Sequence, residues 1–105
     1  MSVDFTFNQY SNIATKTDLM RDRTYSILGL VSEVGEVASK EKKFMRDDKE
    51  IDKEELKYEL GDILWYLNSY AEQNNLTLEE IAYANNYKLT SRMQRGKIHG
   101  DGDQR

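Results

Sequence analysis

Residues 30–37 read Leu-Val-Ser-Glu-Val-Gly-Glu-Val, and residues 56–63 repeat the pattern as Leu-Lys-Tyr-Glu-Leu-Gly-Asp-Ile. Side chains three residues apart share one face of an α-helix, which has about 3.6 residues per turn. Each copy therefore presents two carboxylates beside an apolar stripe. The pairs are Glu33 with Glu36 and Glu59 with Asp62. Because two such pairs brought together supply the oxygen ligands of a divalent metal ion, the repeat predicts two helices that share a metal site.

The charges around these acids differ from those of an ordinary solvated helix. A surface helix usually gives each Glu a Lys or Arg three or four residues away, because such pairs contribute a few tenths of a kcal/mol. Of the four acids, only Glu36 has such a neighbour, Lys40. Glu59 instead lies one turn after Glu55 and one turn before Asp62. Like charges stacked in this way require neutralisation from outside the helices, which a bound cation would provide.

A glycine lies inside each acidic pair, at Gly35 and Gly61. Glycine in a helix interior costs about 1 kcal/mol relative to alanine, so its use twice at the same offset calls for a reason. Without a Cβ, two helix backbones can approach closely, which predicts that the four carboxylates converge at this level. A chance glycine in an acidic surface helix is the alternative for either copy alone.

Length and composition favour a small all-α protein. The chain has 105 residues and no proline, and we expect one domain that spans residues 1–105. The absence of cysteine excludes disulfides and thiolate metal sites. With 19 acidic and 15 basic residues, the chain lacks the basic surface of a nucleic-acid-coating protein. It shows no secretory signal and no apolar run approaching about 20 residues, so we expect a cytoplasmic protein without a membrane partner.

Capping signals and apolar periodicity predict four helices and no strands. Three residue pairs have the spacing of an N-terminal capping box, which places helix starts near residues 6, 52 and 77: Thr6 with Gln9, Asp52 with Glu55, and Thr77 with Glu80. A further helix should begin within residues 22–25 and run to about Phe44, because apolar residues recur there at helical spacing. We expect these helices to pack as a four-helix bundle.

The helix that begins near residue 52 is apolar on two sides. Its main stripe consists of Leu56, Leu60, Ile63, Leu67 and Tyr70. Tyr58 and Trp65 lie on nearly the opposite side. Because four short helices supply only one core, the second side suggests a homo-oligomer, either a homodimer or a homotetramer. The alternative is that Trp65 covers the terminal segments of the same chain.

The composition becomes cationic and glycine-rich after Asn85, and a tail begins at about residue 96. The residues concerned are Lys88, Arg92, Arg95, Lys97, His99 and Arg105, with Gly96, Gly100 and Gly102 between them. Lys88, Arg92 and Arg95 share one helix face by their spacing. Such a face beside a carboxylate site suits a polyanion held through metal, such as a nucleoside triphosphate. The alternative is that these cations complement the helix macrodipole.

Further short motifs accompany the two acidic pairs. They are Phe7-Asn8-Gln9-Tyr10, Gly29-Leu30-Val31-Ser32, Asn85 with Lys88, and Arg95-Gly96 through Gly100-Asp101-Gly102-Asp103. With E-x-x-E at Glu33 and Glu36 and E-x-x-D at Glu59 and Asp62, they resemble the MazG-like members of the all-α nucleoside triphosphate pyrophosphohydrolases. The resemblance covers most of the chain.

The resemblance implies a helical bundle that depends on Mg²⁺ and cleaves a nucleoside or deoxynucleoside triphosphate between its α and β phosphates. The products would be the nucleoside monophosphate and pyrophosphate. By position, the metal-ligand and catalytic roles would fall on the four acids: Glu33, Glu36, Glu59 and Asp62. The phosphate-contacting roles would fall on Asn85 and Lys88, with Arg92 on the same basic face. Tyr66, one turn after the last acid, would lie over the base, although a core tyrosine is the commoner fate of such a residue.

The residue types agree with this chemistry independently of the family. Carboxylate oxygens suit Mg²⁺, with Mn²⁺ as a substitute, and the site contains no cysteine or histidine. A bound metal ion would neutralise the polyphosphate and lower the pKa of an attacking water. Either Glu36 or Glu59 could accept the proton of that water, and the sequence does not choose between them.

Three other interpretations compete with this one. A di-iron carboxylate bundle needs Glu-x-x-His motifs, whereas the chain has a single histidine, His99, in the tail. A phosphoribosyl-ATP pyrophosphohydrolase would share the fold and the bond cleaved. A non-catalytic helical interaction module would use the acids as a solvated or partner-facing surface.

Overall fold

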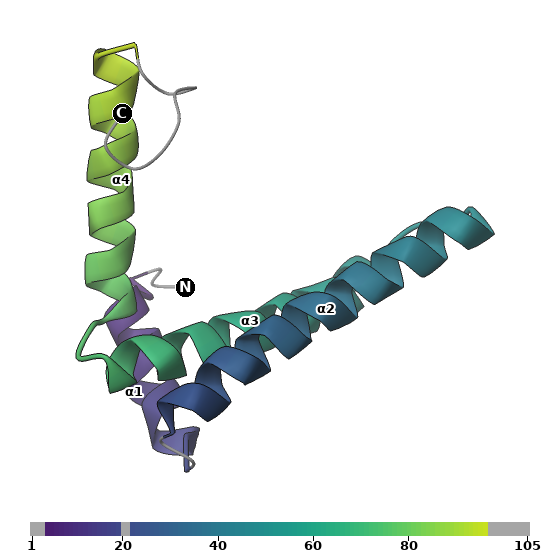
Figure 1. Cartoon of the computed structure of the whole chain (residues 1–105), viewed down its shortest axis with the longest axis horizontal. Coiled ribbons are helices and arrows are strands. Elements are labelled where there is room, and N and C mark those ends of the chain that lie inside the picture. The colour runs from purple at the N-terminus through teal and green to yellow at the C-terminus, as the bar shows by residue number, and fades with distance from the viewer. Residues whose placement is uncertain (1–3, 20–21, 97–105) are drawn as a thin grey trace.

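The computed structural model describes residues 4–19 and 22–96, which form four α-helices joined by short connections (Figure 1). The helices are α1 (Phe7–Thr17), α2 (Arg23–Asp47), α3 (Lys53–Gln73) and α4 (Leu78–Gln94). No strand occurs in either described range. The predicted all-α fold with four helices is confirmed. The predictions for Lys97, His99, Arg105 and the tail glycines beyond Gly96 lie outside the described residues.

Each helix begins where the sequence predicts, three from capping pairs and α2 from apolar periodicity. The N-cap residues are Thr6, Asp22, Asp52 and Thr77. The capping boxes at Thr6 and Thr77 form in full, with side chain and backbone bonded reciprocally. Asp52 also caps its helix, but the Glu55 carboxylate accepts a hydrogen bond from Lys40 on another helix instead. The α2 helix continues to Asp47, three residues beyond the predicted end.

The two long helices form an antiparallel hairpin, and the two shorter ones cross it at one end. Figure 1 shows α2 and α3 side by side, while α4 turns away from them and gives the chain the outline of an L. The α4 helix packs on α1 and α3 but has no Cα atom within 8 Å of α2. The radius of gyration is 16.7 Å, against about 13 Å for a compact chain of this length. One chain therefore does not close its helices around a common core.

Small polar side chains fill the junction of α1, α2 and α3. Ser26 on α2 lies 2.7 Å from Ser69 on α3, oxygen to oxygen, and Ser69 donates to the Asp18 carboxylate at the end of α1. Nearby, Ser11 of α1 donates to Asn68 of α3 at 2.7 Å. All five side chains are buried. Because buried polar groups are costly unless they are hydrogen-bonded, this network fixes how the three helices meet.

The apolar residues contribute little to this junction. Among the described residues, the buried hydrophobic side chains are those of Ala14, Ala71 and Leu78.

Trp65, from the second apolar side of α3, donates its indole N–H to Thr17 at 2.8 Å. This supports the alternative prediction that Trp65 covers a terminal segment of its own chain. Tyr58, from the same side, remains 73% exposed.

One glycine is required by close packing, and it is neither of the two predicted. A Cβ built at Gly29 on α2 would lie 2.6 Å from Cζ of Tyr66 on α3, so the aromatic ring occupies the space of the missing side chain. A Cβ at Gly35 or Gly61 would have no neighbour within 4 Å. The predicted close approach at these two glycines is therefore wrong within one chain, because both face outward from the hairpin.

We expect Gly29→Ala to destabilise the protein by about 1 to 3 kcal/mol, because the added methyl group must displace the ring of Tyr66. Helix propensity alone predicts the opposite sign, a gain of about 1 kcal/mol. The same substitution in a Tyr66→Ala background should be neutral or stabilising. Denaturant unfolding of the four proteins in this cycle measures the coupling. Equal or greater stability of the single Gly29→Ala variant would contradict the packing described.

Candidate metal centre

The antiparallel hairpin brings three of the four predicted acids together. One carboxylate oxygen from each of Glu33, Glu59 and Asp62 lies within 4.8 Å of the others. Ligand oxygens of an octahedral Mg²⁺ ion are about 3 to 4 Å apart, given Mg–O distances of about 2.1 Å. Small side-chain rotations would therefore suffice to place the three oxygens around one cation. We call these three residues the acid cluster.

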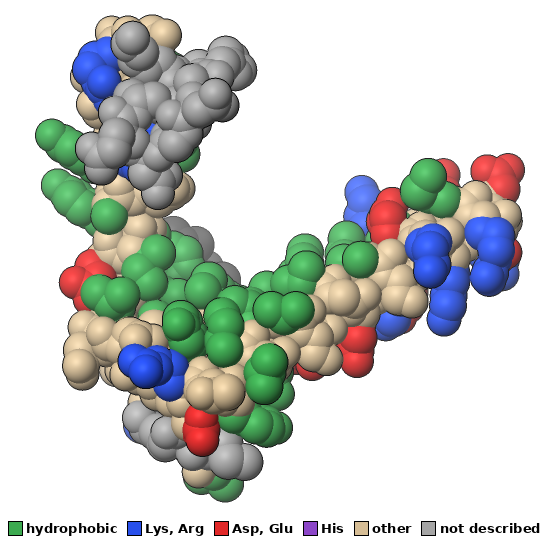
Figure 2. All heavy atoms as spheres, in the orientation of Figure 1, with side chains coloured by type: hydrophobic (Ala, Val, Ile, Leu, Met, Phe, Trp, Pro, Cys, Tyr) green, Lys and Arg blue, Asp and Glu red, His purple; other side chains and the backbone are tan. Residues whose placement is uncertain are grey.

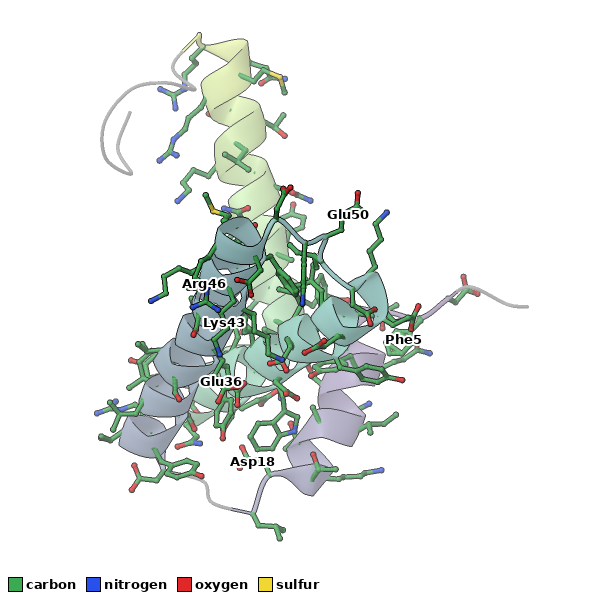
Figure 3. All side chains as sticks on the ribbon, turned by 90° about the vertical axis from the view of Figure 1, so that its right-hand side faces the viewer. Phe5, Asp18, Glu36, Lys43, Arg46 and Glu50 are labelled. Atoms are coloured by element: carbon green, nitrogen blue, oxygen red, sulfur yellow. The ribbon has the colours of Figure 1, made fainter. Side chains whose placement is uncertain are left out.

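Glu36, the fourth predicted acid, lies at the edge of the acid cluster. Its side chain is exposed, and its charge contributes to raising the pKa of Glu33 one turn earlier. Figure 3, which looks toward the outer end of the hairpin, shows Glu36 along α2 with Lys43 and Arg46 beyond it. A ligand or proton-accepting role for Glu36 stays a prediction.

Two oxygens of the acid cluster are buried without a hydrogen-bond partner. They are Oε2 of Glu33 and Oε2 of Glu59. Burial raises the pKa of Glu33 above its ordinary value, and the nearby carboxylates of Glu36, Asp62 and Glu59 raise it further. A buried carboxylate oxygen without a donor is unfavourable. The cluster therefore favours uptake of a proton or of a metal cation.

Lys40 partly neutralises the cluster, but through α3 and not through its own helix. Its ammonium donates to Oε1 of Glu59 at 2.7 Å and to Oε1 of Glu55 at 2.6 Å. Hydrogen bonds to Glu55 and then Glu59 raise the pKa of Lys40 above its ordinary value. Lys40 lies four residues after Glu36 on the same helix, but its bonded partners are the two carboxylates of the facing helix.

Tyr66 lies near the acid cluster and contacts two other aromatic side chains. The ring of Tyr66 packs edge-on against Trp65 at 5.1 Å and lies 6.3 Å from the ring of Tyr25. A hydrogen bond with Tyr25 is the main cause that raises the pKa of Tyr66, followed by burial, with smaller effects of Tyr25, Glu33 and Asp62 charges. Tyr66 thus lies beside the acids, as its predicted substrate-binding role requires, and that role stays a prediction.

Tyr10 and Tyr25 were not predicted to lie near the acid cluster. Burial and then the Asp62 carboxylate raise the pKa of Tyr10, which places this α1 residue near the acids. No fixed spacing links either tyrosine to the acidic pairs. The only signal was the short motif that ends at Tyr10, whose location depends on how α1 crosses the hairpin.

The predicted phosphate-binding residues lie on the helix that turns away. Asn85 is exposed and Lys88 is half-buried, and both line a surface hollow of α4 with Ile81 and Ala84. Arg92 is only 3% exposed, in contrast to the exposed basic face that its spacing predicts. The α4 helix contacts α3 but not α2, and Figure 1 shows it leading away from the hairpin, so in the described residues of one chain Asn85 and Lys88 do not join the acid cluster.

The arrangement of two acidic pairs on an antiparallel helix hairpin agrees with the family comparison. The model of the MazG nucleotide pyrophosphohydrolase domain matches residues 22–96, from the N-cap of α2 to just beyond α4. The chain belongs to the MazG family. The MazG match includes every predicted site residue and leaves α1 outside.

Among known proteins, the chain is similar to the gene 37 protein of Mycobacterium phage L5. The two are 39% identical over 92 residues, which cover 84% of this chain and 81% of the phage protein. No solved structure matches the chain significantly. Within residues 4–19 and 22–96, no helix combines the length and the apolar character needed to cross a membrane.

We expect Glu33→Gln to raise the free energy of unfolding of the metal-free protein by about 0.5 to 1 kcal/mol at pH 7. The folded state raises the pKa of Glu33, so its charged form is destabilising, and the gain should vanish as the pH falls toward the ordinary value of 4.5. Mg²⁺ should raise the Tm of the wild type more than that of the variant. Thermal melts with and without Mg²⁺ measure both effects.

Glu50→Gln provides the control, because Glu50 is an exposed acid in the loop between α2 and α3 (Figure 3). Its removal should change stability by less than about 0.5 kcal/mol and leave the Mg²⁺ response intact. Identical behaviour of the two variants would show that Glu33 is an ordinary surface acid.

Proposed function

We propose that this MazG-family protein is a Mg²⁺-dependent nucleotide pyrophosphohydrolase. It would cleave a nucleoside or deoxynucleoside triphosphate between the α and β phosphates and release the monophosphate and pyrophosphate. The observation that carries the proposal is the acid cluster: oxygens of Glu33, Glu59 and Asp62 converge, and two carboxylate oxygens of the cluster are buried without a partner. Membership of the MazG family supports the same reaction class.

The residues present fit the proposed metal ion. Every available ligand in the acid cluster is a carboxylate oxygen, which suits Mg²⁺ or Mn²⁺ and disfavours metals that prefer sulfur or nitrogen. When bound, the ion would neutralise the polyphosphate and activate a water for in-line attack at the α phosphorus. The buried, unbonded oxygens of Glu33 and Glu59 would gain the electrostatic partner that the free protein lacks.

The surroundings of each acid indicate whether it would bind the metal ion or accept a proton. Glu33, Glu59 and Asp62 would hold the metal ion, because their oxygens already converge. Glu36 is exposed at the edge of the cluster, so it is better placed than the Lys40-bound Glu59 to accept the proton of the attacking water. Tyr66 would contact the nucleoside from the inner end of the cluster.

The proposed reaction is tested by incubating the protein with a panel of ribo- and deoxyribonucleoside triphosphates and Mg²⁺, with products separated by ion-exchange chromatography. We expect monophosphate and pyrophosphate from at least one nucleotide, because the metal site would polarise the α phosphorus. Asp62→Asn serves as the control and should lose at least 100-fold in kcat, about 2.7 kcal/mol of transition-state stabilisation. Diphosphate with inorganic phosphate would indicate γ cleavage. No turnover of any nucleotide would favour a non-catalytic interaction module.

We further propose that the protein works as a homodimer. Figure 2 shows hydrophobic side chains gathered along the hairpin on the inner side of the bend. On α2, Leu28 and Val31 are 63% and 64% exposed, and the outward-facing Gly35 continues their stripe by one turn. A monomer rarely leaves such large apolar side chains exposed along one helix. A second copy that packs on this stripe would complete the core that one chain lacks.

The dimer would also complete the active site. Asn85 and Lys88 lie on the helix that turns away from the hairpin of its own chain, and in the dimer they would reach the acid cluster of the second copy. Each site would then combine carboxylates from one copy with phosphate-binding side chains from the other. Their positive charge and amide donors would hold the polyphosphate opposite the metal ion.

We expect Val31→Glu to convert the dimer to a monomer, because it places a charge in the middle of the apolar stripe. Sedimentation velocity measures the change, with the exposed Lys57→Glu on α3 as the control. A wild-type protein that is monomeric at all concentrations would contradict the dimer.

A second test asks whether the active sites are shared between copies. Glu33→Gln and Lys88→Ala proteins should each be inactive alone and regain about one quarter of wild-type activity when unfolded and refolded together, because half of the dimers would be mixed and each mixed dimer would contain one intact site of two. No recovery would show that each site uses residues of one chain only.

A further inference from the structure

Lys40 differs from the ion-paired Lys57 of the same hairpin, because it joins the two helices. Its ammonium lies between Glu59 and Glu55 of α3, at 2.7 and 2.6 Å. Its side chain is 37% exposed and that of Glu59 only 19%. Lys57 and Glu54, by contrast, form a 2.9 Å pair within α3, with side chains 66% and 74% exposed.

The two oxygens of Glu59 have different surroundings. Oε1 accepts the hydrogen bond from Lys40, and Oε2 is buried without a hydrogen-bond partner. Glu59 also belongs to the acid cluster with Glu33 and Asp62. The ammonium of Lys40 is therefore bonded to a residue that would bind the metal ion.

We propose that Lys40 is a resident counter-ion of the acid cluster, which stabilises the metal-free protein and competes electrostatically with a free divalent cation. This inference rests on the metal site of the proposed function. Without metal, the ammonium offsets part of the repulsion among the carboxylates. When a metal ion approaches, the positive charge of Lys40 repels it, and Lys40 competes with it for the negative charge of the Glu59 carboxylate. Lys40 would thus keep the affinity for free metal low.

The consequence for catalysis concerns the order in which metal ion and nucleotide bind. A metal ion that arrives already bound to a nucleoside triphosphate carries compensating negative charge, so Lys40 opposes it less than it opposes the free ion. The site would therefore fill preferentially with the metal–nucleotide complex. A lysine that served only to join α2 to α3 would have no such effect on metal binding.

The test measures metal binding directly, without nucleotide. Metal-free full-length wild type and variants are titrated with Mn²⁺, and free Mn²⁺ is followed by electron paramagnetic resonance. We expect Lys40→Met to lower the Tm of the metal-free protein and to tighten Mn²⁺ binding about tenfold. Lys40→Arg retains the charge and should bind Mn²⁺ as the wild type does. Lys57→Met is the matched control, because it removes an exposed ion pair of the same hairpin, and it should leave Mn²⁺ affinity unchanged.

Each result decides between distinct interpretations. Unchanged Mn²⁺ affinity in Lys40→Met would show a purely structural helix–helix ion pair and overturn the inference. Weaker affinity would also overturn it, since that result means Lys40 only orients Glu59. No Mn²⁺ binding by either the wild type or Lys40→Met would overturn the proposed metal site itself, and the inference with it. If Lys40→Met does not fold, Lys40→Gln provides the same comparison, because it keeps a hydrogen-bond donor without the charge.

Discussion

The antiparallel contact between α2 and α3 is the constraint on which the site depends. Each acidic pair alone is an ordinary feature of a charged helix, and the pairs acquire chemical meaning only where the two helices lie at the correct height and rotation. At the inner end, the Ser26–Ser69 contact fixes the pair. At the outer end, Lys40 fixes it through Glu59. These polar contacts hold α2 and α3 together on either side of Glu33 and Asp62, so the packing of the two helices sets the geometry of the acid cluster.

The sequence was sufficient for the local structure and for the identity of the acids. All four helix starts were readable, three from capping pairs three residues apart in the chain and that of α2 from apolar periodicity. The convergence of Glu33 with Glu59 and Asp62 followed from the repeat, because matched motifs on two helices share a face. These inferences needed only helical periodicity and the chemistry of carboxylates.

Contacts between helices could not be predicted in the same way. Lys40 lies four residues after Glu36, but its partners Glu55 and Glu59 are distant in sequence, and local spacing does not reveal them. The close-packing role was assigned to Gly35 and Gly61, whereas Gly29 is the one against an aromatic ring. Spacing reveals which residues share a face, but the direction of that face and the path of α4 depend on tertiary packing.

The ring of Tyr66 in the notch at Gly29 has a consequence for the alignment of the hairpin. A helix advances about 1.5 Å per residue, so sliding α3 by a single position would drive the ring into a neighbouring side chain of α2. The contact of the Tyr66 ring with the backbone at Gly29 therefore permits only one register of α2 against α3. Glu33 and Asp62 lie one turn from the notch, on α2 and α3 respectively, so the steric stop sets the spacing of the carboxylates that face each other.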